Sequence, residues 1–493
     1  MGQAMHNLAM MLKETAARYA ERVALITSDS RMTYLELERS ACALGSHLRS
    51  LGLGKGDKVA IMLPNCPEFV IAYFGVQKIG GVAVTLHTQS TPYELRYLLK
   101  NSDSLCLITQ GELVRRFEEI RDELPLCQHL ITTGAPEQPS PFLDIIQKGP
   151  FTIAIPELTG DDPAAMIYTS GLTGKPRGAV LTHQNLYTQS ELLRTVVNSD
   201  ERDIGLAVIP LFHSFGAVAN MISPLRIGAG VVLMERFTLD GIFSMIEKEK
   251  VTYVAAVPRL FLGMFFHEKA DNYRIDSLKV CITGGAAMPA DFIPLFEKKF
   301  GVRIMEGYGL TEASPVASFS RLNMPQKPGS IGIPIPRVTA RIVDEAGVEL
   351  PRGAVGELIL QGENVMKGYY KDEKATAQVL RDGWLYTGDL ARMDEEGYIY
   401  ITGRKKRMII TSGFNVYPKE IEDVLNLHPA VQESLVIGKE DLLRGETVKA
   451  LVVRKPDAPV EERELLKHCR TYLSSYKAPR EIEFAEKIDH PEK

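Results

Sequence analysis

The chain has 493 residues, too many for one hydrophobic core, so two or more packed units are expected. Hydrophobic residues make up 45% and charged residues 24%, the ordinary mixture of a soluble globular protein. Acidic residues outnumber basic ones by 62 to 57, and the net charge of −5 argues against a nucleic-acid-binding protein. Any anionic substrate must therefore be held by local donors rather than by a positive field over the whole molecule.

The cysteines and the N-terminal segment indicate a cytoplasmic protein. The six cysteines are scattered, with no C-x-x-C pair and no metal-ligand spacing, so reduced thiols are expected. Residues 1–25 contain no long apolar run, and Glu14 and Glu21 interrupt the candidate helix. Neither a signal peptide nor an integral membrane segment is expected there. The oligomeric state is left open by the sequence, with a homodimer among the alternatives.

The N-terminal part of the chain alternates short apolar runs with amphipathic stretches. Residues 57–63 predict a strand, 67–80 a helix and 81–86 the next strand, which together form a βαβ unit of a parallel sheet. Further strands are predicted at residues 105–109, 130–133, 165–168, 231–234, 253–257, 280–283 and 303–305. The predicted fold class is therefore α/β, with parallel-rich sheets covered by helices.

From about residue 329 the pattern changes to short strands at 340–343, 356–360 and 398–401, separated by Gly, Pro and Asp turns. This pattern predicts a small, mostly antiparallel β unit. After the basic run 404–407, the last ninety or so residues predict a compact α+β domain, with a hinge near Arg404. We expect an N-terminal domain at 1–403 and a small mobile C-terminal lid domain at 404–493. The N-terminal domain is expected to contain α/β subdomains at 1–160 and 161–328 and a β-barrel-like subdomain at 329–403.

The most informative segment is residues 168–178, YTSGLTGKPRG, which predicts a glycine-rich loop between two strands. Glycines let backbone N–H groups turn toward a ligand, and the hydroxyl groups and two cations add donors, so the loop suits a polyphosphate. It is not a Walker A motif, because Pro176 follows Lys175 and a strand rather than a helix follows the loop. A surface loop without a ligand is the alternative.

This segment resembles the phosphate loop of the acyl-adenylate-forming enzymes, a superfamily that contains acyl-CoA synthetases, peptide-synthetase adenylation domains and luciferases. The resemblance implies a nucleotide-binding loop and two cations that stabilise the transferred phosphoryl group. The loop residues are Thr169, Ser170, Gly171, Thr173 and Gly174, and the cations are Lys175 and Arg177.

A second matching segment is GYGLTE at residues 307–312, directly after an apolar strand. The resemblance implies that Gly307 and Tyr308 lie against adenine, Thr311 on the α-phosphate and Glu312 on Mg²⁺. A carboxylate suits a hard cation beside phosphates, although a solvated β-turn glutamate is the alternative reading.

Two further segments resemble the surroundings of the acyl group. In GGAA at 284–287, Gly285 and Ala286 are implied to let adenine and the acyl chain pass close to the backbone. In IPLFHSFG at 209–216, His213 is implied to lie near the substrate carboxylate, although a lone histidine is more often structural. The apolar and small residues of these segments favour a hydrophobic monocarboxylic acid.

The remaining matches lie toward the C-terminus. In YTGDL at 386–390, Asp389 is implied to hold the ribose hydroxyls. In GRKK at 403–406, Arg404 is implied to reach the same ribose and Lys406 to stand at the hinge. A solvated face is the alternative for this basic run. In TSGFNVYP at 411–418, Ser412 and Gly413 are implied to lie along the pantetheine tunnel of coenzyme A. The wording SGFNVYP looks most like that of bacterial medium- and long-chain fatty acyl-CoA synthetases.

The resemblance covers nearly the whole chain and implies an ATP- and Mg²⁺-dependent ligase that activates an acid as acyl-AMP and passes the acyl group to coenzyme A. The alternatives are an enzyme that loads the phosphopantetheine of a carrier protein and a weakly active nucleotide- or acyl-binding relative.

The sequence departs from its relatives at three places. Leu172 stands where relatives usually carry Ser, Thr or Gly, and Arg177 replaces the usual Lys. Relatives also continue to a Gly-Lys pair whose Lys contacts the carboxylate and the α-phosphate, whereas this chain reads AEKIDHPEK up to residue 493. We therefore expect weak adenylation, with thioester formation from supplied acyl-adenylate less affected.

Overall fold

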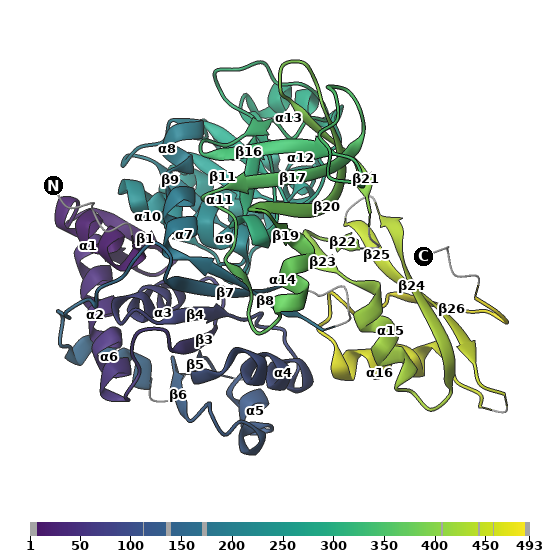
Figure 1. Ribbon diagram of the computed structural model, residues 1–493. Coiled ribbons are helices and arrows are strands. Elements are labelled where there is room, and N and C mark those ends of the chain that lie inside the picture. Colours follow the sequence, from purple (N-terminus) through teal and green to yellow (C-terminus); the bar gives the residue numbers. More distant parts are fainter. Residues whose placement is uncertain are drawn as a thin grey trace.

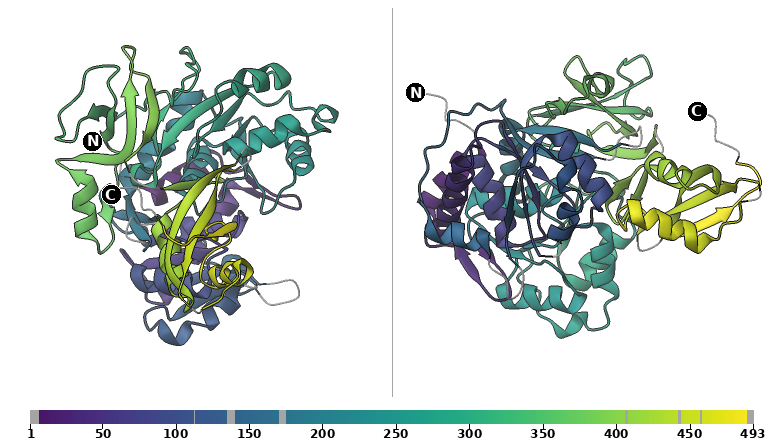
Figure 2. Two further views of the ribbon diagram at one scale, coloured as in Figure 1. Left: turned by 90° about the vertical axis from the view of Figure 1, so that its right-hand side faces the viewer. Right: turned by 90° about the horizontal axis from the view of Figure 1, so that it is seen from below.

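A computed structural model describes residues 7–111, 113–134, 140–169, 175–405, 408–441, 444–456 and 458–488. Two parallel-rich sheets covered by helices form most of the molecule, and the C-terminal unit lies against one side of them (Figures 1 and 2). The predicted α/β fold class is confirmed. No helix in the described part of the chain is long and apolar enough to span a membrane.

The first sheet has the strand order β18-β8-β7-β4-β3-β5-β6. Its strands are β3 (Lys58–Met62), β4 (Val82–Thr85), β5 (Ser104–Thr109), β6 (His129–Thr132), β7 (Pro163–Thr169), β8 (Arg177–Thr182) and β18 (Gly368–Tyr369). The βαβ unit predicted over residues 57–86 is confirmed, because β3 and β4 pair in parallel and α3 (Pro67–Lys78) connects them. Every residue of β4 is buried, as expected for a parallel strand covered on both faces.

The second sheet has the order β15-β14-β13-β12-β11-β9-β10-β1-β2. Its strands are β1 (Val23–Ile26), β2 (Arg31–Thr33), β9 (Ile204–Ala207), β10 (Gly230–Leu233), β11 (Tyr253–Ala256), β12 (Val280–Thr283), β13 (Arg303–Gly309), β14 (Val316–Phe319) and β15 (Ile333–Pro334). Neighbours from β1 to β13 are parallel. Since β1 and β2 belong here while β7 and β8 belong to the first sheet, the predicted boundary at residue 160 does not follow the sheets.

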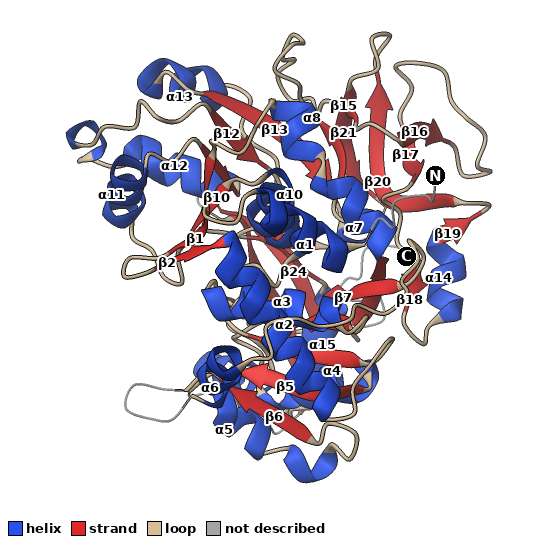
Figure 3. Ribbon diagram, turned by 90° about the vertical axis from the view of Figure 1, so that its left-hand side faces the viewer, coloured by secondary structure: helices blue, strands red, loops and turns tan. Residues whose placement is uncertain are grey.

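The helices flank these sheets, and Figure 3 shows α1, α2, α3 and α10 on one side of the molecule. The helices of this part are α1 (Leu8–Arg18), α2 (Tyr34–Ser50), α4 (Pro92–Ser102), α5 (Leu113–Glu118), α6 (Pro141–Lys148), α7 (His183–Ser190), α8 (Leu192–Val197), α9 (Ser214–Ala217), α10 (Ser223–Ile227), α11 (Leu239–Glu249), α12 (Pro258–Phe266), α13 (Phe292–Phe300) and α14 (Glu373–Val379). A capping box between Thr91 and Glu94, with Pro92 at the first position, fixes the start of α4.

The predicted antiparallel unit after residue 329 is a separate sheet, with the order β16-β17-β20-β19 and β21 paired to β20. Its strands are β16 (Val338–Val343), β17 (Gly356–Gly362), β19 (Leu380–Arg381), β20 (Trp384–Met393) and β21 (Ile399–Arg404).

The C-terminal unit has its own sheet and its own buried core. It contains β22 (Ile409–Thr411), β23 (Phe414–Val416), α15 (Pro418–Asn426), β24 (Val431–Asp441), β25 (Gly445–Arg454), α16 (Glu462–Tyr472) and β26 (Glu481–Phe484). The hairpin β22–β23 faces the sheets of the N-terminal part, and α16 contacts α4. The mobility expected for this unit stays a prediction.

Candidate active site

The predicted phosphate loop leaves the end of β7 and returns at the start of β8. These strands are antiparallel, with Thr169 opposite Arg177, so the predicted strand–loop–strand arrangement is confirmed. Four predicted ligands within the loop lie outside the described residues: Ser170, Gly171, Thr173 and Gly174. Leu172 and the predicted hinge residue Lys406 also lie outside them. The structure therefore fixes the two ends of the loop, and Thr169 and Lys175 are the described residues beside it.

The GYGLTE turn meets the first end of this loop. The Glu312 carboxylate accepts hydrogen bonds from the Thr169 hydroxyl at 3.3 Å and from the Tyr369 hydroxyl at 2.7 Å. Burial raises the pKa of Tyr369, and the neighbouring Glu312 raises it further, so the phenol keeps its proton and donates. The group of three side chains therefore presents oxygen atoms at the mouth of the phosphate loop.

This oxygen-rich group fits Mg²⁺, a hard cation that prefers oxygen ligands and is often shared with substrate phosphates. Among the described residues there is no cluster of three or more His, Cys, Asp or Glu side chains that would hold a metal by itself. A lone Glu312 is thus suited to a cation that phosphate oxygens also coordinate.

The same turn contacts the segment predicted to surround the acyl carboxylate. The Thr311 hydroxyl lies 3.1 Å from the hydroxyl of Ser214, the residue after His213. The Nδ1 atom of His213 accepts the Phe215 N–H at 3.3 Å, which leaves Nε2 to carry the ring proton. Burial lowers the pKa of His213 to about 4, so the ring is neutral at pH 7 and its Nε2–H is a donor.

The residues predicted to hold adenosine form one hydrogen-bonded chain. Tyr308 donates its hydroxyl to one Asp389 oxygen at 2.5 Å, and Arg404 Nε donates to the other at 3.1 Å. Burial and the adjacent carboxylate raise the pKa of Tyr308 well above its ordinary value. An aromatic ring, a carboxylate acceptor and a guanidinium are therefore brought together from β13, β20 and β21.

Small residues let separate turns approach this region closely. A Cβ on Gly284 would lie 3.2 Å from the Gly307 carbonyl oxygen and 3.4 Å from the Phe215 ring. Ala286 follows Gly285, whose φ is +80°, and a Cβ on Gly285 would lie 3.8 Å from the Gly413 oxygen.

The turn between β22 and β23 rests on the N-terminal part. Gly413 has a φ of +85°, and a Cβ there would lie 2.5 Å from Cγ1 of Val257. Arg259 donates to the Ser412 hydroxyl at 3.3 Å. The backbone at Gly413 thus approaches Val257 more closely than a larger residue could.

A cavity of about 740 Å³ opens between the N-terminal part and the C-terminal unit. Four predicted site residues line it: Thr169, Lys175, His213 and Thr311. Phe414, from the C-terminal unit, lines it as well, and its ring lies 6.1 Å from that of His213. The structure therefore places residues from four of the matching segments around one cavity.

Arg177 differs in its placement from this group. Its guanidinium pairs with Asp372 at 3.1 Å and lies 5.6 Å from the centre of the Tyr369 ring. It is not among the residues that line the cavity. Because the carboxylate and the ring already hold Arg177, it supports Tyr369 in this structure, and its role on the phosphoryl group stays a prediction.

Two contacts of this region were not predicted. Tyr369 follows a glycine on the short edge strand β18 and has no pattern that would connect it to Glu312, 57 residues earlier. Lys477 and Glu94, which also line the cavity, form an ion pair across 383 residues. A signal for such long-range pairs would have to come from residues that vary together among related chains.

Comparison with known proteins identifies this arrangement. Residues 12–370 match the family model described as AMP-binding enzyme, and residues 420–492 match its C-terminal domain model. The chain belongs to the AMP-binding enzyme family. The predicted resemblance to the acyl-adenylate-forming enzymes is thereby confirmed.

This AMP-binding enzyme is similar to curated and solved relatives over nearly its full length. It is 36% identical to the long-chain-fatty-acid–CoA ligase of Bacillus subtilis (strain 168), covering 98% of this chain and 91% of the relative. The o-succinylbenzoate CoA synthetase of Bacillus subtilis superposes with a TM-score of 0.86 at 29% identity, covering 98% and 95%. The amide bond synthetase of Marinactinospora thermotolerans superposes with a TM-score of 0.90 at 26% identity, covering 98% and 96%. Ligation of an acyl group to coenzyme A is thus supported at the level of the family, while the acids named for these relatives differ.

Proposed function

We propose that this AMP-binding enzyme joins a hydrophobic monocarboxylic acid, a medium- or long-chain fatty acid, to coenzyme A at the expense of ATP. The observation that carries the proposal is the meeting of Thr311 and Glu312 with Thr169 and the His213 segment. These contacts bring close together the side chains that we expect to bind the phosphates, the metal ion and the acyl carboxylate. The names of the sequence relatives, which are long-chain-fatty-acid–CoA ligases, support the choice of acid.

The first step makes the acid a good acyl donor. One carboxylate oxygen attacks the α-phosphorus of ATP, the bond to the β-phosphate oxygen breaks, and pyrophosphate leaves with the electron pair. Lys175 and the Thr311 hydroxyl supply fixed donors for the charge that builds on the phosphoryl oxygens. The His213 Nε2–H donates to the carboxylate and orients it.

A bound Mg²⁺ would neutralise phosphate charge in this step, and Glu312 is the residue that would hold it. Tyr369 and Thr169 keep the Glu312 carboxylate in one orientation. The Tyr308 ring and the Asp389 carboxylate would hold the adenine and the ribose.

In the second step the thiol sulfur of coenzyme A attacks the carbonyl carbon, the bond to AMP oxygen breaks, and AMP leaves as an anion while the thiol proton goes to solvent. The turn at Gly413 approaches Gly285 closely, and the backbone of these two glycines would line the route of the thin thiol arm. A cytoplasmic location is part of the proposal, and the cysteines support it because all six are free thiols.

The test is product analysis with the purified protein, ATP, Mg²⁺ and coenzyme A. The acids are acetate, octanoate and palmitate, with malonate as a dicarboxylate control. We expect equal amounts of acyl-CoA and AMP from octanoate or palmitate, and little product from malonate. Formation of ADP, or no acyl-AMP with any of these acids, would overturn the proposal.

A further inference from the structure

A buried ion cluster joins the C-terminal unit to α4. The Lys477 ammonium lies 2.9 Å from Glu94, at the start of α4, and 2.7 Å from Glu420, on α15. All three residues are buried: Lys477 is 6% exposed, Glu94 7% and Glu420 8%. One cation therefore bridges a carboxylate from each side of the boundary between the two parts.

Contacts within the N-terminal part hold Glu94 in position independently of the C-terminal unit. One Glu94 oxygen accepts the Thr91 N–H at 3.0 Å, which closes the capping box of α4. The same oxygen accepts the hydroxyl of Ser474 at 2.5 Å, and the Thr91 hydroxyl donates to the Tyr472 carbonyl at 2.9 Å. The start of α4 therefore binds the segment 472–477 through several hydrogen bonds and an ion pair.

This contact is connected to the cavity through aromatic rings. The Tyr476 ring stacks on His87 with centroids 4.9 Å apart, and Phe414 packs against Tyr476 at 4.7 Å. Phe414 in turn lies 6.1 Å from His213. A displacement of Lys477 would therefore displace Tyr476 and then Phe414, which begins β23 directly after Gly413.

Because its charges are buried, this cluster is favourable only when all three side chains are in place. Burial raises the pKa of Glu420, and the two carboxylates raise that of Lys477. Such clusters add little to overall stability compared with apolar residues, but removing one partner leaves an uncompensated buried charge. The cluster forms only when Lys477 is seated on α4, so it favours this arrangement of the two parts over others.

We propose that Lys477 is a positioning residue for acyl transfer: its ammonium group, held between Glu94 and Glu420, fixes the C-terminal unit on α4 and so keeps the turn between β22 and β23 seated on the N-terminal part. The kinetic consequence rests on the proposed function. The arrangement itself does not, and it can be measured without turnover.

The structural test is a cross-link across the boundary. Ser475 and Gln89 contact each other at 2.7 Å from opposite sides, so the double variant Gln89→Cys/Ser475→Cys should react rapidly with a short bismaleimide. Adding Lys477→Met should slow this cross-link about 100-fold, because it leaves buried carboxylates unpaired, whereas Lys477→Arg should recover most of the rate. Unchanged cross-linking with Lys477→Met would overturn the proposal. Of the native cysteines only Cys66 is not fully buried, and single-cysteine variants control for it.

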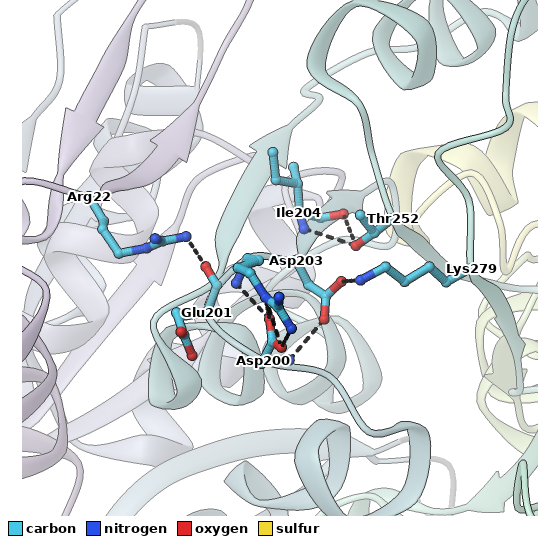
Figure 4. Close-up of polar contacts among 8 residues, drawn as sticks. Arg22, Asp200, Glu201, Asp203, Ile204, Thr252 and Lys279 are labelled. Carbon is cyan, nitrogen blue, oxygen red and sulfur yellow. Dashed lines mark hydrogen bonds and ion pairs between the residues drawn. The ribbon is translucent and has the colours of Figure 1, made fainter.

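A matched control exists elsewhere in the chain. Lys279 pairs at 2.6 Å with Asp203, a buried carboxylate that also accepts the Asp200 N–H at 2.8 Å (Figure 4). Lys279→Met also removes a lysine from a buried carboxylate, but Lys279 is exposed and the contact lies within the N-terminal part, so we expect no change in the cross-link. An equal slowing in Lys279→Met would mean general destabilisation and would contradict the proposal.

Should Lys477→Met fail to fold, the charge-reduced variant Glu94→Gln/Lys477→Met replaces it. This variant leaves Glu420, which burial already favours in its protonated form. It should fold but still cross-link slowly, because no cation then bridges α4 and α15, whereas rapid cross-linking would contradict the proposal.

The kinetic test separates the two half-reactions. For Lys477→Met, transfer from preformed acyl-AMP to coenzyme A should fall about 100-fold, while pyrophosphate release should change less than about threefold. Equal slowing of both steps would contradict the positioning role. If the unaltered protein forms no acyl-AMP, the proposed function fails while the cross-link still decides whether Lys477 holds the two parts together.

Discussion

Tyr369 donates its hydroxyl hydrogen to Glu312 over 2.7 Å and so joins the edge of the first sheet to a turn of the second. Tyr369 lies on β18, which pairs with β8 directly after the phosphate loop, and Glu312 follows β13. The phosphate loop therefore lies next to the hydrogen bond that connects the two sheets. The Arg177 guanidinium lies over the same ring, 5.6 Å from its centre.

Glu312→Gln should lower the rate of pyrophosphate release about 100-fold or more, because a neutral amide binds Mg²⁺ poorly beside phosphates. The measurement is ATP-dependent pyrophosphate release at several Mg²⁺ concentrations. Tyr369→Phe should cause a smaller loss and a weaker apparent affinity for Mg²⁺. Glu349→Gln, which removes an exposed carboxylate paired with Arg341, is the control, and a comparable loss there would argue against the metal role.

Asp389→Asn should raise the KM for ATP about tenfold or more while the KM for the acid changes little. The carboxylate accepts from two side chains now and would accept from ribose hydroxyls in the complex, and hydrogen bonds to a charged group contribute about 1.5–3 kcal/mol. Asp394→Asn is the control, because Asp394 pairs with Lys327 in the same sheet region. An unchanged KM for ATP in Asp389→Asn would show that the ribose lies elsewhere.

Gly413→Ala should slow acyl transfer to coenzyme A more than adenylation. The added Cβ would lie 2.5 Å from Val257 and would also stand at a φ of +85°. Gly397→Ala separates these effects, since Gly397 has a φ of +88° with no heavy atom within 4 Å of the added Cβ. Rapid measurement of each half-reaction should show a defect in Gly413→Ala that is absent in Gly397→Ala.

His213 should make the fold sensitive to acid. Its pKa is lowered from 6.5 to about 4, so the unfolded chain binds the proton first as the pH falls. The stabilisation from this group is complete above pH 6.5 and is lost as the pH falls toward 4. His213→Asn should gain about 2 kcal/mol relative to the unaltered protein between about pH 7.5 and about pH 5 in chemical unfolding. A constant difference across that range would contradict a ring that stays neutral in the folded protein.

Much of the fold could be predicted because strands of parallel sheets are short apolar runs. The strand β4, for example, reads VAVT and is wholly buried. Which strands pair could not be predicted, because periodicity carries no information about partners. The strand β1 pairs with β10, about two hundred residues later, and nothing in the local sequence indicates this pairing.

Several candidate site residues could be named from local motifs, and their roles stay predictions. Tyr308, Asp389 and Arg404 came from separate motifs, and the structure joins them by hydrogen bonds. The role of Arg177 on the phosphates stays a prediction, and no local sequence pattern indicates the distant carboxylate and ring that contact it. Nothing in the local sequence marks Lys477 as buried, because its burial depends on contacts with α4, which lies far away in the sequence.

The most direct measurement is a crystal structure of the protein with Mg²⁺ and a stable acyl-AMP analogue, an acyl sulfamoyl adenosine. The account predicts adenine against the Tyr308 ring, ribose hydroxyls on Asp389 and the sulfamoyl group beside Thr311. An analogue bound elsewhere, with the hydrogen bonds from Tyr308 and Arg404 to Asp389 unchanged, would contradict it.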